Sequence, residues 1–161
     1  AKTGGNYAAS LLPQKLAADQ GFSQVCFLDV TGTNIEELGG MNIFVVMEDG
    51  TVRTPRVDSG TVLEGGTRAA IMRLLRDNGT VVHETDIPLV ELVEGIESGE
   101  VAELFACGTA AVVTPIGRLG ADDFDVTLPV GPVTRAVYDQ LTSIQLGITP
   151  DPYGWTYKIC D

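Results

Sequence analysis

A lysine lies at the second position of the chain, two residues before a pair of glycines and close to an aromatic hydroxyl, in the segment Lys2–Tyr7. Because glycine has no Cβ, a bulky partner can approach the backbone closely here. A lysine amine whose pKa is lowered is neutral, and it can form a Schiff base with an aldehyde. The alternative is a solvated terminal lysine, and only the neighbouring chemistry decides between the two.

A pair of carboxylates, Glu36 and Glu37, precedes a Gly-Gly break at residues 39–40 and an apolar segment that begins at Met41. A carboxylate held near the end of a strand could pair with a protonated ring nitrogen, or could act as an acid or a base. The alternative is a turn whose carboxylates are simply solvated.

The segment Leu63–Arg68 contains Gly65-Gly66-Thr67 and leads into a helical apolar pattern. The first N–H groups of a helix lack intrahelical partners, and the helix dipole favours an anion there. The segment therefore predicts a phosphate cup, and the alternative is that Thr67 only caps its own helix. The sequence has neither a Gly-Lys-Ser/Thr loop nor a G-x-G-x-x-G motif after a strand.

Small residues gather in a fourth segment, Phe105–Ala111, which offers the Thr109 hydroxyl on a turn between two apolar runs. The alternative is tight strand packing, and Cys107 is a poor nucleophile candidate because no histidine accompanies it. Together the four segments offer an amine, a carboxylate, a phosphate cup and a polar turn. Pyridoxal 5'-phosphate requires a Schiff-base lysine, an acidic partner for its ring nitrogen and a grip on its phosphate.

Composition excludes several other classes of function. The 161 residues suit one domain, and 44% apolar with 20% charged residues suits a packed core. A net charge of −12 disfavours nucleic acid and anionic membranes as partners. Three widely spaced cysteines and a single histidine predict neither a metal site nor a disulfide framework, and they favour a reducing, cytoplasmic location. No apolar run reaches the roughly 18 residues that span a bilayer.

The elements expected to position these segments come from apolar periodicity and turn residues. Helices are expected at 7–19, 67–77, 88–96 and 133–146, and Pro13 is expected to kink or restart the first one. Strands are expected at 24–29, 41–47, 51–54, 81–87, 101–107, 110–113 and 124–128, with a hairpin joining 41–47 to 51–54. Because the strands and helices follow no strict βαβ rhythm, we expect an α/β fold of mixed α+β character with hairpins, rather than a doubly wound parallel sheet.

Several segments closely resemble the branched-chain amino acid aminotransferases, which are class IV, fold-type IV enzymes dependent on pyridoxal phosphate. These segments are Lys2–Ser10, Glu36–Phe44, Phe105–Pro115, Leu141–Gly147 and the Gly154-Trp155 ending. The resemblance runs through essentially the whole chain, and it matches only the large C-terminal domain of that family. It implies that residues 1–161 are one cofactor-binding domain, with a mixed β-sheet or pseudo-barrel surrounded by helices. It also implies that the family's N-terminal domain, which precedes the lysine, is absent from this chain.

The resemblance implies a role for each candidate residue. Lys2 would form the Schiff base and then carry the proton between the substrate Cα and the cofactor's C4′ atom. Tyr7 would hydrogen-bond the phenolic oxygen of the cofactor, and Glu37 would pair with its pyridinium nitrogen. Leu63 would pack on the face of the ring.

The resemblance also implies the residues around the phosphate and the substrate. The phosphate would be bound by Gly66, Thr67 and Thr109, and the substrate carboxylate would be bordered by Gly40, Thr109 and Ala110. The family usually has Leu-Pro-Gly-(Val/Ile)-Thr-Arg at the cup. This chain departs from that pattern with Glu64, which adds a carboxylate near a dianionic phosphate, and with Gly66, which loosens the turn.

The implied reaction is transamination, in which leucine, isoleucine or valine gives up its amino group and leaves as a 2-oxo acid. The co-substrate 2-oxoglutarate then becomes glutamate. The resemblance implies a homodimer with a site completed between domains, so we expect residues 1–161 alone to be nearly inactive. Two alternatives stay open. One is another fold-type IV enzyme, a D-amino acid aminotransferase or an aminodeoxychorismate lyase, and the other is a non-enzymatic acidic domain that binds a phosphate ligand or a protein partner.

Overall fold

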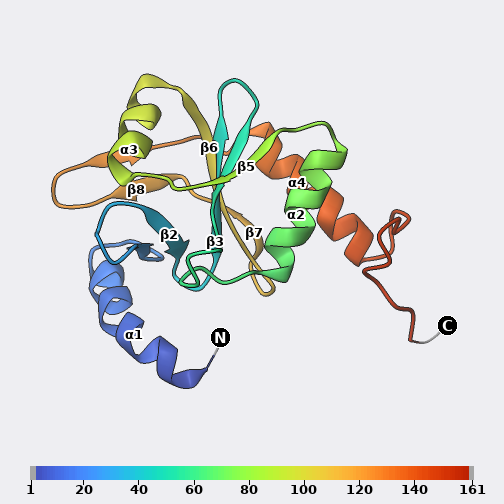
Figure 1. Ribbon diagram of the computed structural model, residues 1–161, viewed down its shortest axis with the longest axis horizontal. Coiled ribbons are helices and arrows are strands. Elements are labelled where there is room, and N and C mark those ends of the chain that lie inside the picture. Colours follow the sequence, from blue (N-terminus) through green and yellow to red (C-terminus); the bar gives the residue numbers. More distant parts are fainter. Residues whose placement is uncertain (1–2, 160–161) are drawn as a thin grey trace.

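The computed structural model describes residues 3–159, and its elements alternate irregularly along the chain (Figure 1). The helices are α1 (Gly4–Asp19), α2 (Gly66–Asp77), α3 (Leu89–Ser98) and α4 (Pro132–Gln145). The strands are β1 (Cys26–Leu28), β2 (Ile35–Leu38), β3 (Asn42–Met47), β4 (Val52–Pro55), β5 (Val82–Thr85), β6 (Val101–Gly108), β7 (Val112–Pro115), β8 (Arg118–Gly120) and β9 (Asp125–Thr127).

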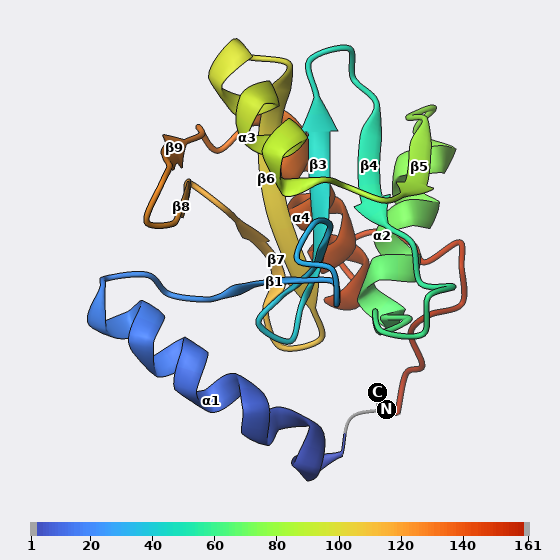
Figure 2. The same cartoon turned by 60° about the vertical axis from the view of Figure 1, so that its left-hand side comes forward.

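A five-stranded sheet in the order β5-β4-β3-β6-β7 forms the centre of the fold (Figure 2). Strand β3 pairs antiparallel with β4 and with β6, β6 pairs antiparallel with β7, and β4 runs parallel to β5. Two further antiparallel ribbons, β1-β2 and β8-β9, lie outside this sheet. The expectation of a mixed α/β fold with hairpins, rather than a doubly wound parallel sheet, is confirmed.

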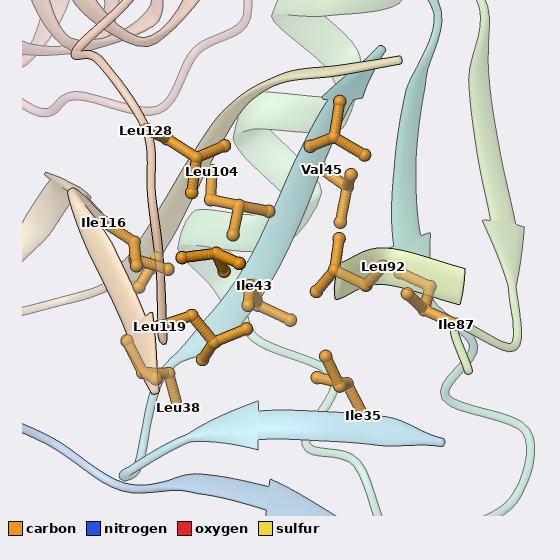
Figure 3. Packing of buried hydrophobic residues seen from close by; sticks show 13 residues of the cluster. Ile35, Leu38, Ile43, Val45, Ile87, Leu92, Leu104, Ile116, Leu119 and Leu128 are labelled. Carbon is orange, nitrogen blue, oxygen red and sulfur yellow. The ribbon is translucent and has the colours of Figure 1, made fainter. Parts of the chain in front are cut away.

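The central strand β3 is buried on both faces, so its alternating side chains belong to two separate cores. Ile43 and Val45 point into a cluster shared with β2, α3 and the β8-β9 ribbon (Figure 3). Phe44 and Val46 point into the cluster formed with α2 and α4, which lie side by side on the opposite face (Figure 1). The Phe44 ring stacks on Phe105 of β6 with centroids 4.9 Å apart. Because a strand alternates its side chains with period 2, one apolar run serves both cores.

Four local differences separate the structure from the sequence-based expectations. The apolar pattern does not predict strands β2 and β8, and β1 is shorter than the expected strand at 24–29 and is half-buried rather than buried. Helix α1 continues across Pro13, so the expected restart is wrong. Most side chains of this helix are exposed to solvent, including those of Leu11 and Leu16. Among residues 3–159, no helix has both the length and the apolarity needed to cross a bilayer.

Candidate functional site

A bulge in β2 places the two neighbouring carboxylates of the acidic pair on one side of the chain. In the register with β1, Glu37 pairs with Phe27 and Ile35 pairs with Leu28, so the extra residue Glu36 has no partner in the ladder. Consecutive residues of a regular strand point to opposite faces, and a bulge removes that alternation. Glu36 and Glu37 consequently each accept a hydrogen bond from the loop at residues 56–65, which connects β4 to α2.

Leu63 in this loop is held at both of its backbone polar groups. Its N–H donates to Oε1 of Glu37 over 3.0 Å, and its carbonyl accepts from Nδ2 of Asn42 over 2.9 Å. The Thr61 hydroxyl donates to the Glu36 carboxylate two residues earlier in the loop. Since β2 and β3 belong to the packed body of the fold, these bonds fix the position of Leu63 relative to the sheet.

Four of the predicted site residues surround one hollow of about 530 Å³, which we call the Glu37 hollow. Its lining includes Tyr7, Glu37, Gly40 and Leu63. Tyr7 comes from α1, and its ring lies 3.8 Å from the point that a Cβ on Gly40 would occupy. Residues separated by more than fifty positions in the sequence therefore share one cavity. The predicted Schiff-base lysine, Lys2, lies outside the described residues.

The start of α2 leaves its backbone donors without side-chain caps. The N-cap position is Gly65, no side chain bonds to the cap, and the first turn has no acidic residue. Thr67 does not cap its own helix, so the structure does not support that alternative. The first N–H groups of α2 remain available to an anion, whose charge the helix dipole favours.

Three predicted phosphate-binding residues line a second hollow of about 690 Å³, which we call the α2 cup. Gly66 and Thr67 lie on one wall, and Thr109 reaches the cup from the turn between β6 and β7. Glu64 lines the Glu37 hollow and is not part of the α2 cup. The extra carboxylate therefore belongs to the neighbouring cavity. Ala110 is exposed on its turn and lines neither hollow.

Sequence reasoning assigned no role to two buried polar residues near the site, Asn42 and Arg68. Asn42 holds Leu63, and Arg68 of α2 donates to the Pro55 carbonyl and to Glu84, each over 2.9 Å. The hydrogen bond from Arg68 keeps the pKa of the Glu84 carboxyl below its usual value. Asn42 could have been found from its place in an otherwise apolar strand, because buried polar groups need partners. Arg68 ties the start of α2 to β4 and β5.

The described residues offer no obvious second chemistry. Between residues 3 and 159, no three His, Cys, Asp or Glu side chains gather in a way that could hold a metal ion. Burial raises the pKa of the Cys107 thiol to about 12, so this thiol is protonated at neutral pH and is a poor nucleophile.

Comparison with known proteins points to one family. The model of the family described as Amino-transferase class IV matches residues 1–119. The branched-chain-amino-acid aminotransferase of Mycobacterium tuberculosis is 46% identical over 99% of this chain, and a probable one from Streptomyces coelicolor is 44% identical over 99%. These alignments cover 45% and 44% of the relatives, so the chain spans about half the length of the curated relatives it matches.

Solved structures give the same result. The branched-chain amino acid aminotransferase from Escherichia coli superimposes with a TM-score of 0.80 and 35% identity, covering 96% of this chain and 49% of that one. The enzyme of the same name from Thermobaculum terrenum, solved in its PLP form, superimposes with a TM-score of 0.75 and 32% identity, covering 91% of this chain and 45% of that one. The family model covers nearly three quarters of the sequence, and the structural match extends over almost all of it. The chain therefore belongs to the class IV aminotransferase family and shares the fold of its fold-type IV members.

Proposed function

We propose that this chain carries the pyridoxal-phosphate site of a branched-chain amino acid transaminase. The observation that carries the proposal is the double anchoring of Leu63 by Glu37 and Asn42, three residues before the uncapped start of α2. It fixes the Leu63 side chain and the anion-binding start of α2, which lie on one short segment, beside the carboxylate of Glu37 from β2. Relatives 40–46% identical over nearly the whole chain bear the name of this activity.

The shape of the site fits the cofactor. The ring would lie in the Glu37 hollow and the phosphate in the α2 cup, because Leu63 and Glu64 line the first cavity and Gly66 and Thr67, which follow closely in sequence, line the second. The ring needs an acidic partner for its nitrogen, and the Glu37 carboxylate already accepts the Leu63 N–H in this hollow. The phosphate needs N–H donors without an opposing charge, and the first turn of α2 has no acidic residue. We therefore assign the phosphate to Gly66, Thr67 and Thr109.

The chain's own residues would act as follows. Bound pyridoxal phosphate supplies an electron sink for the amino acid's Cα–H bond. Glu37 would keep the ring nitrogen protonated, Tyr7 would donate to the phenolic oxygen, and Leu63 would cover the ring face. The amine of Lys2 would hold the cofactor between turnovers and accept the substrate's Cα proton. Gly40, with Thr109 and Ala110, would border the substrate carboxylate.

We propose leucine, isoleucine and valine as amino donors and 2-oxoglutarate as the acceptor, which becomes glutamate. We further propose that residues 1–161 form the cofactor-binding domain of a cytoplasmic homodimer. Because the matched relatives are about twice as long as this chain, we expect a second domain to complete the substrate pocket. Nucleic acid and membranes are not proposed as partners, since the net charge of −12 repels both.

The cofactor assignment can be tested with two lysine variants. Pyridoxal phosphate added to the wild-type chain should give a visible absorbance band that borohydride fixes covalently at Lys2, located by peptide mapping. Lys2→Ala should lose both signals. Lys15→Ala should keep both, because Lys15 is exposed on α1 and pairs with Asp19, 2.9 Å away. Reduction that labels Lys15 or Lys158 instead of Lys2 would refute the assignment.

The reaction assignment needs a substrate panel. The panel consists of L-leucine, D-alanine and aminodeoxychorismate, each offered with 2-oxoglutarate. It should be tested on a protein that contains both residues 1–161 and the second domain, and on residues 1–161 alone. L-leucine should be preferred, and D-alanine or aminodeoxychorismate as the better substrate would favour the other fold-type IV activities. Turnover of about 1 s⁻¹ or more by residues 1–161 alone would contradict the need for a second domain. Absence of any lysine-linked cofactor would favour a non-enzymatic ligand-binding domain.

A further inference from the structure

The segment after α4 forms an ordered turn at residues 151–156, which we call the C-terminal turn. The Asp151 carboxylate accepts the Tyr153 N–H over 3.0 Å on one oxygen. Its other oxygen accepts the N–H of Thr156 over 2.7 Å and the Thr156 hydroxyl over 2.9 Å. Gly154 adopts a φ of +69°, which residues other than glycine rarely adopt. Several bonds to one carboxylate therefore give this segment a defined shape.

The C-terminal turn is fastened to α2 through Tyr153. The Tyr153 hydroxyl donates to Oδ2 of Asp77 over 3.0 Å, and Nε of Arg73 donates to the same oxygen over 2.9 Å. The Arg73 guanidinium lies 5.8 Å from the centroid of the Tyr153 ring. The Trp155 ring stacks on Tyr153 with centroids 4.2 Å apart and planes 18° apart. The position of Trp155 is thus set by Tyr153, which α2 holds.

Tyr153 and Trp155 line the same α2 cup as the residues assigned to the phosphate. The cup is lined by Gly66, Thr67 and Thr109, and also by Arg73, Tyr153 and Trp155. The cup has a volume of about 690 Å³ and is open to water. Water competes for the N–H donors of a helix end, and removing it strengthens their attraction for an anion. An aromatic wall in this lining would reduce that competition.

We propose that Trp155, held by Tyr153, is a positioning residue that closes the α2 cup over the phosphate of the bound cofactor. This inference rests on the proposed function, because it takes the anion in the cup to be the cofactor's phosphate. Trp155 donates nothing to the reacting atoms. It excludes water from the donors of Gly66 and Thr67 and covers the phosphate side of the cofactor. Arg73 of α2 also lines the cup, where its cation would favour an anion in a strongly acidic protein.

Trp155 is the single tryptophan of the chain, so its fluorescence reports directly on this wall. Inorganic phosphate at saturation should lower acrylamide quenching of Trp155, because an anion in the cup shields the ring. Trp155→Ala should weaken pyridoxal phosphate binding about fivefold. Binding of unphosphorylated pyridoxal should be unchanged, since it lacks the group that the wall covers. Trp155→Phe should restore most of the affinity because it keeps an aromatic ring.

Tyr157→Ala provides the matched control, since Tyr157 is an exposed aromatic residue of the same segment and does not line the cup. Equal pyridoxal phosphate affinity for Trp155→Ala and Tyr157→Ala would overturn the proposal. An equal loss for pyridoxal would overturn it as well. If circular dichroism shows that Trp155→Ala does not fold, two other measurements test the proposal. These are the effect of inorganic phosphate on acrylamide quenching of the wild-type chain and the affinity of Trp155→Phe for pyridoxal phosphate. Failure of the proposed function would look different, as wild-type chain would form no lysine-linked cofactor while quenching still responded to inorganic phosphate.

Discussion

Two adjacent glycines at the start of α2 should respond in opposite ways to the same substitution. A methyl group on Gly65 would lie 2.2 Å from Oδ1 of Asn42, far inside van der Waals contact, so Asn42 would have to move. A methyl group on Gly66 meets no atom within 4 Å. The backbone of Gly65, with φ −70° and ψ 133°, suits alanine, so only the contact with Asn42 opposes the change.

The expected cost of Gly65→Ala follows from the surroundings of Asn42. Asn42 is 5% exposed, and its amide donates to the Leu63 carbonyl over 2.9 Å. Leaving a buried polar group unsatisfied costs about 1–3 kcal/mol, and overpacking costs about 1–3 kcal/mol. Since one displacement causes both effects, we expect a loss of about 2–4 kcal/mol in the free energy of unfolding. Gly66→Ala should be neutral or should gain up to about 1 kcal/mol from helix propensity.

Urea denaturation followed by circular dichroism measures both variants, with an unchanged m-value as the check that unfolding stays comparable. Gly65→Ala should also weaken binding of pyridoxal phosphate, because a displaced Asn42 releases Leu63 and the start of α2. Gly66→Ala keeps the backbone N–H and should bind at least as well as wild type. Unfolding free energies for the two variants within about 0.5 kcal/mol of each other would refute the reasoning.

Three further predictions concern groups away from the cofactor. Glu103→Ala removes the buried carboxylate that accepts two N–H groups at the start of α4, over 3.0 and 2.8 Å, and denaturation should show a loss of about 3 kcal/mol. The exposed control Glu97→Ala should stay within about 0.5 kcal/mol of wild type, and equal losses would contradict this role. The native pKa of Glu84 is depressed, so its stabilising contribution is complete above the carboxyl's ordinary pKa and is lost as pH falls through the native pKa. Glu84→Gln should therefore lose less unfolding free energy than wild type on acidification, which denaturation at a series of pH values would measure. Parallel plots of unfolding free energy against pH for the two proteins would contradict this. Burial raises the pKa of the Cys26 and Cys107 thiols to about 12, so a thiol reagent at neutral pH should label these two only after denaturation, and rapid labelling of either one in the native chain, located by peptide mapping, would argue otherwise.

The hairpin and the main helices could be predicted because their apolar patterns are strong. Asn42–Met47 and Val52–Pro55 flank a turn sequence, and Gly66–Asp77 has helical periodicity that ends before a glycine. Strand β2 escaped prediction because its four residues include the pair Glu36-Glu37 and its bulge breaks the alternation. The continuity of α1 through Pro13 was also not predicted, because a proline inside a helical pattern indicates a kink or a restart there.

Residue types and local order determined much of the site. The sequence alone reveals a carboxylate pair, a Gly-Gly-Thr helix start and a small-residue turn, because each of these features consists of residues that are neighbours in the chain. Which of these segments meet in space was decided by tertiary structure alone. The bulge in β2 let Glu36 and Glu37 bond to the same loop, Asn42 reached Leu63 across 21 positions, and the C-terminal turn brought Trp155 to the α2 cup. The physical reason is that these contacts join residues on different elements, and only the packing of both faces of β3 fixes where those elements lie.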